Sequence, residues 1–164
     1  MKIESVYQRA RILVVDDEPA NTVVLDKMLA QAGFEEVMTL NDSAAVLDRC
    51  QSWDPDLVLL DLHMPEPNGF ELLPRLRDLA GDRYLPILVL TADTTDDAKD
   101  RALAIGANDF VTKPFRYNET LLRIRNLLET RWLQEQVRRH SATLESQLRH
   151  ATQGEQERQA WQRE

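Results

Sequence analysis

Residues 57–61 read LVLLD, four apolar residues that lead directly into an aspartate. A continuous apolar run this short is typical of a strand that is buried on both faces of a sheet. The next residues, 62–69, read LHMPEPNG, and their two prolines and glycine would end such a strand. Asp61 is therefore predicted to lie at the carboxyl end of a buried strand, the edge of an open α/β sheet at which ligands bind.

Four further apolar runs alternate with helical patterns on both sides of this stretch. Strands are predicted at residues 11–15, 36–40, 86–90 and 108–111, and helices are predicted to start near residues 19, 41, 68, 94 and 117. A strand and a helix thus follow each other five times. This alternation predicts an α/β fold with a parallel sheet, right-handed crossovers and helices on both faces.

Size and composition restrict the class of protein. The 164 residues are 43% hydrophobic and 29% charged, which fits one soluble domain with an appendage. No apolar run approaches the roughly 20 residues that span a membrane. Residues 1–11 have no signal-peptide pattern, so a cytoplasmic location is expected. Cys50 is the only cysteine, which excludes an internal disulfide.

The negative charge is concentrated in the first four fifths of the chain. The net charge is −8, and residues 131–164 carry six arginines against five glutamates, so residues 1–130 are strongly acidic. An acidic body repels nucleic-acid phosphates. We therefore expect no direct binding of nucleic acid.

The last part of the chain has a different pattern. Between residues 118 and 151 there is no proline or glycine, and apolar residues recur at helical spacing. The 4-3-4-3 steps of a coiled-coil seam join Val137, Ser141, Leu144, Leu148 and Ala151. A lone helix of this length is marginal in water, so a homodimer through it is predicted. The chain then comprises a polar lead-in at 1–10, a domain at 11–130 and a helical extension at 131–164, frayed over roughly its last ten residues after Gly154.

Reactive side chains follow four of the predicted strands. They are Asp16 and Asp17, Asp61, Thr91, and Lys113. In a parallel sheet all of these would meet at one edge, where clustered carboxylates need a cation such as Mg²⁺. A metal, a lysine and a hydroxyl are the groups that phosphoryl transfer requires, with an aspartate as nucleophile. Each residue alone has a simpler explanation, such as a helix cap or a solvated loop, but their joint order favours a site.

The chain resembles the response-regulator receiver domains of two-component signalling over about residues 10–130. The matching pieces are ILVVDD at 12–17, LLDLHMP at 59–65, NG at 68–69, LTA at 90–92, GANDF at 106–110 and TKPF at 112–115. This resemblance implies a flavodoxin-like (βα)5 doubly wound sheet of order 2-1-3-4-5. It also implies that the domain is no enzyme beyond promoting its own phosphorylation and dephosphorylation.

The resemblance assigns a role to each residue of the predicted site. Asp61 resembles the phosphoacceptor, and Lys113 the lysine that binds the phosphoryl group, followed by a cis bond to Pro114. The Mg²⁺ ligands would be Asp16, Asp17, Asp61 and the backbone carbonyl of His63. Thr91 resembles the switch hydroxyl and Phe110 the switch aromatic. His63 and Asp93 would flank the site and tune the lifetime of the phosphate, although His63 is also readily explained as an exposed loop residue.

The expected function follows from these roles. A histidine kinase or phosphotransfer protein would donate a phosphoryl group to Asp61 in a Mg²⁺-dependent reaction. The change would pass through the last helix to a dimer partner or to an output domain, such as one of cyclic-dinucleotide signalling. Residues 131–164 are too few and too polar to form the core of such an output domain.

Three other functions fit these residues less well. A pseudo-receiver that only binds proteins would not need intact Asp17, Asp61, Thr91 and Lys113. A phosphatase of the haloacid dehalogenase type would need an acid at the position of His63. A nucleotide-binding domain would need a Gly-x-Gly-x-x-Gly motif after the first strand, and none is present.

Overall fold

The computed structural model describes residues 1–161, apart from the side chains of Glu157 and of residues 159–161. The chain divides into two compact units, Met1–Arg131 and Trp132–Glu164. Within the described residues, no helix has both the length and the apolar character that crossing a membrane demands.

The first unit is built on a five-stranded parallel sheet. Its strands are β1 (Arg11–Val15), β2 (Glu36–Leu40), β3 (Leu57–Asp61), β4 (Ile87–Thr91) and β5 (Asp109–Thr112). The strand order is β2-β1-β3-β4-β5, and every neighbouring pair is parallel. The predicted fold class and strand order are therefore confirmed.

In the described part of the chain, five α-helices and two short 3-10 helices accompany the strands. They are η1 (Ser5–Tyr7), α1 (Pro19–Ala32), η2 (Ser43–Ala45), α2 (Val46–Trp53), α3 (Gly69–Ala80), α4 (Asp96–Ala104) and α5 (Tyr117–Trp161). Local chemistry sets several of their ends. The Asn68 side chain accepts from the N–H of Glu71 while the Glu71 carboxylate accepts from the N–H of Asn68, a reciprocal cap at the start of α3. Gly33 ends α1 in a left-handed conformation with φ 105°.

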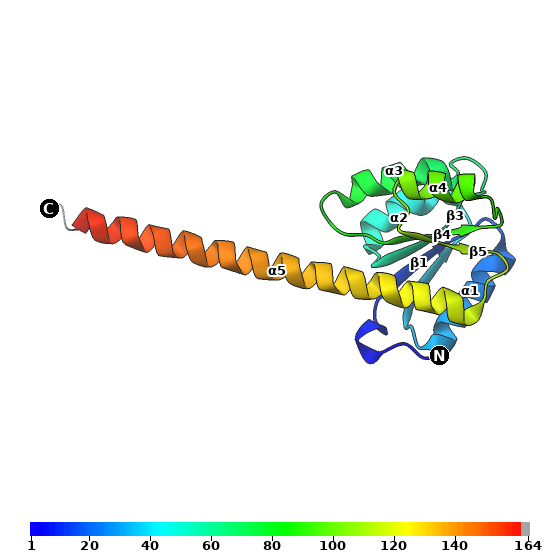
Figure 1. Ribbon diagram of the computed structural model, residues 1–164, viewed down its shortest axis with the longest axis horizontal. Coiled ribbons are helices and arrows are strands. Elements are labelled where there is room, and N and C mark those ends of the chain that lie inside the picture. The colour runs from blue at the N-terminus through cyan, green and yellow to red at the C-terminus, as the bar shows by residue number, and fades with distance from the viewer. Residues whose placement is uncertain (162–164) are drawn as a thin grey trace. The chain divides into compact units, whose positions relative to one another are not determined.

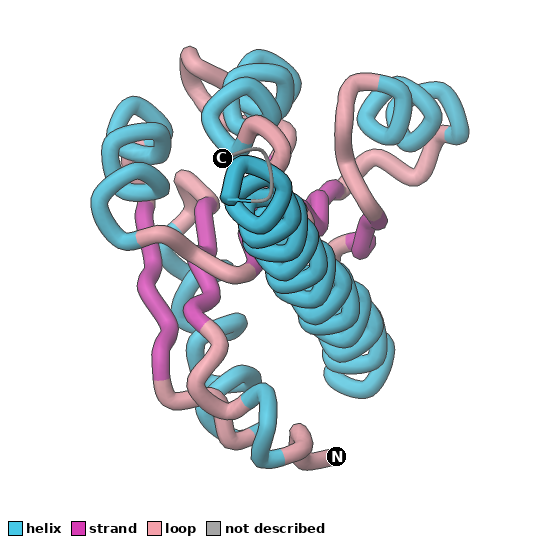
Figure 2. The backbone as a smooth tube through the Cα atoms, turned by 90° about the vertical axis from the view of Figure 1, so that its left-hand side faces the viewer, coloured by secondary structure: helices cyan, strands magenta, loops and turns pink. Residues whose placement is uncertain are grey.

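Two helical layers enclose the sheet. The helices α2, α3 and α4 cover one face, and α1 with the first part of α5 covers the other (Figure 1 and Figure 2). Alternate residues of β3 serve the two faces, because Leu57 and Leu59 pack with α1 and α5 whereas Val58 and Leu60 pack with α2 and α3. Every residue of β3 and β4 is buried, as expected for central strands of a parallel sheet.

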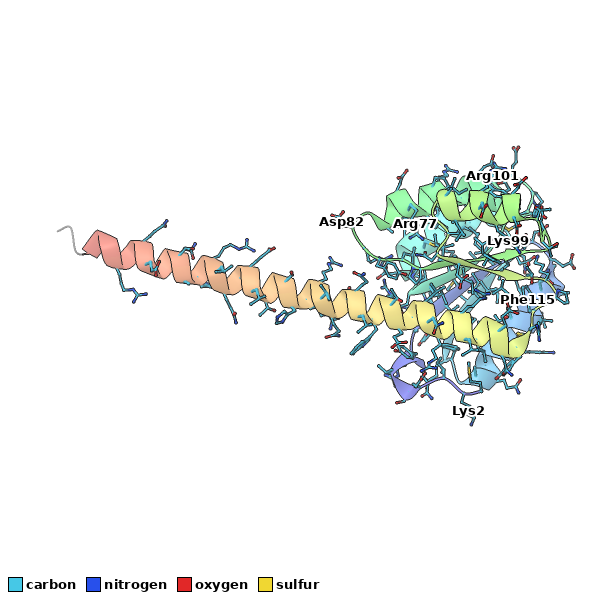
Figure 3. The ribbon with its side chains drawn as sticks, viewed as in Figure 1. Lys2, Arg77, Asp82, Lys99, Arg101 and Phe115 are labelled. Carbon is cyan, nitrogen blue, oxygen red and sulfur yellow. The ribbon has the colours of Figure 1, made fainter. Side chains whose placement is uncertain are left out.

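Arg77 lies on α3 (Figure 3), and its hydrogen bonds join this helix to the loops that precede β4 and β5. Its Nε atom donates to the carbonyl of Gly106 at 2.8 Å, and the rest of its guanidinium donates to the carbonyl of Leu85 and to the side chain of Asn108. The same Asn108 oxygen accepts the N–H of Ile87 at 2.8 Å. This half-buried network holds the start of β4 and the turn before β5 in fixed positions.

The N-terminal residues, predicted as a polar lead-in, pack on the rest of the first unit. Ile3 is buried, and its N–H donates to the carbonyl of Ala32 at 2.9 Å. The hydroxyl of Tyr117 donates to the carbonyl of Met1 at 3.0 Å. Residues 1–10 therefore touch both the end of α1 and the start of α5.

The described part of the second unit consists of residues 132–161 of α5. The large apolar side chains described in this unit are all exposed, namely Trp132, Leu133, Val137, Leu144 and Leu148. Ion pairs between residues three or four apart, such as Glu135 with Arg139, support the helix. The helix passes through Gly154 to Trp161, and residues 162–164 lie outside the described part. The fraying of the last residues stays a prediction. The coiled coil stays a prediction.

Candidate functional site

The side chains predicted to converge do meet at the carboxyl edge of the sheet. Asp16 follows β1, Asp61 is the last residue of β3, and Lys113 follows β5. The Nζ atom of Lys113 lies 2.8 Å from Oδ2 of Asp16 and 3.2 Å from Oδ1 of Asp61. Both aspartates are buried, with 0% and 2% of their surface exposed. One ammonium group therefore pairs with two buried carboxylates.

A third carboxylate completes an acidic cluster. Asp16, Asp17 and Asp61 each offer a carboxylate oxygen, and these oxygens lie within 4.8 Å of one another. Asp17 is exposed, which leaves the cluster open to solvent on one side. Three acids against one lysine leave negative charge in excess, and a set of hard oxygen donors fits a divalent cation such as Mg²⁺.

The protonation of Asp61 reflects its surroundings. Burial raises the pKa of Asp61 to about 6, and the neighbouring charge of Asp16 adds to this rise. Lys113 and the N–H of His63, which donates to Oδ1 at 3.2 Å, act in the opposite direction. Burial also acts to lower the pKa of Lys113, but its hydrogen bonds and ion pairs with Asp16 and Asp61 outweigh burial and raise that pKa.

Thr91 is buried at the end of β4, and its hydroxyl is bonded within its own loop. It accepts the N–H of Asp93 at 3.0 Å and donates to the carbonyl of Asp93 at 3.3 Å. The backbone carbonyl of Thr91 is also bonded, because it accepts the N–H of Lys113, the residue after β5, at 2.8 Å. Thr91 therefore belongs to the same edge as Lys113.

Phe110 on β5 is half-buried between cations of two helices. The Nζ atom of Lys99 on α4 lies 4.9 Å from the ring centroid, and the Cζ atom of Arg123 on α5 lies 5.5 Å from it. Figure 3 labels Lys99 on α4. Such contacts hold an aromatic ring by attraction between the cation and the ring face. Arg123 is itself fixed by both carboxylate oxygens of Asp109, at 2.7 and 2.9 Å.

His63 has an exposed side chain, and its ring meets that of Phe70 edge-on at 6.3 Å between centroids. The peptide bond from Lys113 to Pro114 is cis, as the resemblance implied. A second cis bond, from Glu66 to Pro67, was not foreseen.

Two supporting residues were not found from the sequence. Nδ2 of Asn41, after β2, donates to the carbonyl of Asp16 at 2.8 Å and to the hydroxyl of Thr22 at 3.1 Å. That hydroxyl in turn donates to the carbonyl of Pro19 at 3.0 Å. Together they fix the backbone of the acidic loop from two sides. An asparagine after a strand reads as a turn residue, so no spacing pattern pointed to this role.

Gly69 lets α3 approach the end of β3 closely. A Cβ atom at this position would lie 2.3 Å from the carbonyl oxygen of Asp61 and 2.6 Å from Cα of Leu62. Only glycine fits there without a shift of the backbone that carries Asp61. The Asn68-Gly69 pair of the sequence thus has a packing reason.

Residues 12–125 match the model of the response regulator receiver domain family. The chain belongs to this family. The receiver is 42% identical over 106 residues to the sensory/regulatory protein RpfC of Xanthomonas campestris pv. campestris, an alignment that covers 63% of this chain and 14% of RpfC. It is 33% identical over 138 residues to the cyclic di-GMP phosphodiesterase response regulator RpfG of the same species, which covers 84% of this chain and 36% of RpfG.

Solved structures agree with this assignment. The receiver matches the chemotaxis protein CheY4 of Vibrio cholerae with a TM-score of 0.67 and 30% identity, over 73% of this chain and 98% of CheY4. The chain thus spans nearly all of CheY4 but less than half of RpfC or RpfG. Receiver domains interact with histidine kinases or phosphotransfer proteins, and as a family they are generally not enzymes.

Proposed function

We propose that this receiver accepts a phosphoryl group on Asp61 from a histidine kinase or phosphotransfer protein, in a reaction that depends on Mg²⁺. One observation carries the proposal. The buried carboxylate of Asp61 lies 3.2 Å from the ammonium of Lys113 and within 4.8 Å of the carboxylate oxygens of Asp16 and Asp17. A nucleophile, a fixed cation and a set of metal ligands are thereby placed around one point.

The proposed step is a transfer between two nucleophiles. A carboxylate oxygen of Asp61 attacks the phosphorus of a phosphohistidine, the P–O bond forms, the P–N bond breaks, and the imidazole nitrogen leaves with the electron pair. The positive charge of Lys113 offsets negative charge on the phosphoryl oxygens. Asp16, Asp17, Asp61 and the carbonyl of His63 would hold Mg²⁺, which supplies further charge compensation when bound.

The proposed response to phosphorylation is a change between two states at Thr91 and Phe110. For Thr91 to donate to a phosphoryl oxygen, its hydroxyl must give up the bond to the carbonyl of Asp93. A ring that turns inward at Phe110 must give up its contacts with Lys99 and Arg123. Phosphorylation shifts the equilibrium between the two states only by the difference between the free energies with which it stabilises each of them.

Beryllium fluoride with Mg²⁺, a mimic of the phosphoryl group, tests the site directly. We expect the wild type to bind it, as measured by fluorine NMR, and Asp61→Asn to lose the bound signal. Asp42→Asn serves as a control, because Asp42 is an exposed acid that caps η2. Equal binding by wild type and Asp61→Asn would contradict the assignment of the phosphoacceptor.

The segment after residue 131 is proposed to pair with a second copy of this chain and to pass the change to that copy or to an output domain. The exposed apolar residues from Leu133 to Leu148 support pairing, because an isolated helix gains little stability in water. The similarity to RpfG over 84% of this chain supports an output in cyclic-dinucleotide signalling. A cytoplasmic location belongs to the same proposal. The intact Asp61 and Lys113 favour a receiver that is phosphorylated over a pseudo-receiver that only binds proteins.

A further inference from the structure

Arg131, the last residue of the first unit, binds at the amino ends of the strands, opposite to the acidic cluster. Its Nε and Nη2 atoms each lie 3.0 Å from Oδ1 of Asp56, and its Nη1 atom donates to the carbonyl of Tyr84. We call this set of contacts the Arg131 clamp. The two charged side chains are only 15% and 26% exposed, so solvent screens their attraction less than in a surface pair.

The clamp touches the amino ends of the strands whose carboxyl ends form the candidate site. Asp56 directly precedes β3, which ends in Asp61, and Tyr84 lies shortly before β4, which ends in Thr91. The other carboxylate oxygen of Asp56 accepts the N–H of Arg11 at 2.8 Å, and Arg11 begins β1, which leads to Asp16. The clamp and the site thus lie at opposite ends of the same three strands.

These strands are suited to carry a displacement between the two edges. All residues of β3 and β4 are buried, and close-packed interiors move as units rather than deforming locally. A five-residue strand spans about 17 Å, so one rigid element covers the distance. The guanidinium is planar, and it can satisfy Asp56 and the Tyr84 carbonyl together only while these two acceptors keep their spacing. A shift of β3 against β4 therefore changes the contact made by α5.

We propose that the Arg131 clamp couples the state of the Asp61 site to the end of α5 within the first unit. This inference rests on the proposed phosphorylation of Asp61. Arg131 is then a positioning residue: it reports the relative position of β3 and β4 to the helix that continues beyond it. The clamp makes the contact between strands and helix that any such transfer needs, since a ligand shifts a distant element only through contacts that differ between two states.

A second ion pair of α5 provides a matched control. Arg125 lies on the same helix, and its Nη2 atom is 2.9 Å from Glu4, but both side chains are more than 40% exposed and Glu4 is not adjacent in sequence to any strand of the site. Arg125→Gln thus makes the same chemical change as Arg131→Gln without touching β3 or β4.

Hydrogen exchange of the full chain, followed by mass spectrometry, tests the coupling. In wild type with Mg²⁺, we expect beryllium fluoride to change the exchange rates of residues 124–131 by at least about twofold, and in Arg131→Gln to leave them unchanged. Arg131→Lys keeps the charge but not the planar fork, so it should also lose the response. Arg125→Gln should retain it. All variants should still bind beryllium fluoride.

Three results would overturn the coupling. The first is an unaltered exchange response in Arg131→Gln, which would make Arg131 a purely structural residue even if the substitution lowered the melting temperature of the protein. The second is a wild type that binds beryllium fluoride without any change at residues 124–131. The third is loss of beryllium fluoride binding in Arg131→Lys, since the clamp would then support the site itself. A wild type that fails to bind beryllium fluoride would instead remove the proposed function, and the coupling with it.

Discussion

The ammonium of Lys113, the residue that follows β5, lies 3.2 Å from the carboxylate of Asp61, the last residue of β3. The same nitrogen lies 2.8 Å from Asp16, so one positive charge stands between two buried negative ones. This arrangement stabilises neither acid fully, because each carboxylate repels the other in a region of low dielectric. The folded protein therefore carries electrostatic strain where a divalent cation and a phosphoryl group are proposed to bind.

The first prediction is that Asp61→Asn stabilises the protein without metal at neutral pH. The pKa of Asp61 is raised from 3.8 to about 6, so its ionised form disfavours the folded state. A pKa difference of one between the folded and unfolded states corresponds to about 1.4 kcal/mol, so the gain in the free energy of unfolding is at most roughly 3 kcal/mol. Urea unfolding monitored by circular dichroism measures it.

The sign of the pH dependence follows from the same shift. A raised carboxyl pKa stabilises the folded state most below the unfolded value of 3.8, and this contribution is lost as the pH rises through about 6. The advantage of Asp61→Asn should therefore grow between these two pH values and level off above the higher one. Asp17→Asn, at the exposed acid, should gain less. An Asp61→Asn protein less stable than wild type near neutral pH would contradict this prediction.

The second prediction separates the metal from the phosphoryl group. Lys113→Gln removes the cation that competes for Asp16 and Asp61, so calorimetry should show Mg²⁺ binding at least as tightly as in wild type. Beryllium fluoride binding should be lost, because its negative charge no longer meets the ammonium. Lys27→Gln, at an exposed lysine of α1, should alter neither. Loss of Mg²⁺ binding with retained beryllium fluoride binding would reverse the assigned roles.

The third prediction concerns the close approach of α3 to β3. Gly69→Ala places a Cβ atom 2.3 Å from the carbonyl of Asp61, so the backbone must shift. We expect a loss of roughly 2 kcal/mol or more in the free energy of unfolding, together with weaker Mg²⁺ binding. At Gly154 on α5 an added Cβ meets nothing within 4 Å, and Gly154→Ala should raise helicity by circular dichroism. Equal stability of wild type and Gly69→Ala would show that the loop adapts freely.

Sequence patterns were sufficient for the sheet and for the edge where the site lies. The run from Leu57 to Leu60 is buried at every position, as its unbroken apolar character indicated, and the acids, threonine and lysine do meet after parallel strands. These features depend on local periodicity and on the rule that parallel strands share a carboxyl edge.

Contacts between residues far apart in the chain could not be predicted in this way. Nothing in the spacing of residues 1–10 indicates that Ile3 is buried against the end of α1. Arg131 lies among many arginines of similar surroundings, and only the fold places it beside Asp56. Asn41 likewise looks like any turn residue until β2 is set beside β1. Such partners are chosen by tertiary packing, which periodicity does not record.

The fourth prediction addresses assembly. Sedimentation velocity should show a dimer for residues 1–164 and a monomer for residues 1–131, because the exposed seam around Leu144 needs a partner surface. Leu144→Asp should convert the full chain to a monomer, whereas Arg149→Gln, at an exposed position of the same segment, should not. A monomer for the unaltered full chain at high concentration would remove the coiled-coil proposal.

The most direct measurement of the central claim is the intact mass of the protein after incubation with a small phosphodonor, such as phosphoramidate, and Mg²⁺. We predict that wild type gains the mass of one phosphoryl group, that chelation of Mg²⁺ prevents the gain, and that peptide mapping locates it on Asp61. Asp61→Asn should gain nothing. A phosphoryl group of equal yield on the Asp61→Asn protein, or none on wild type, would contradict the account.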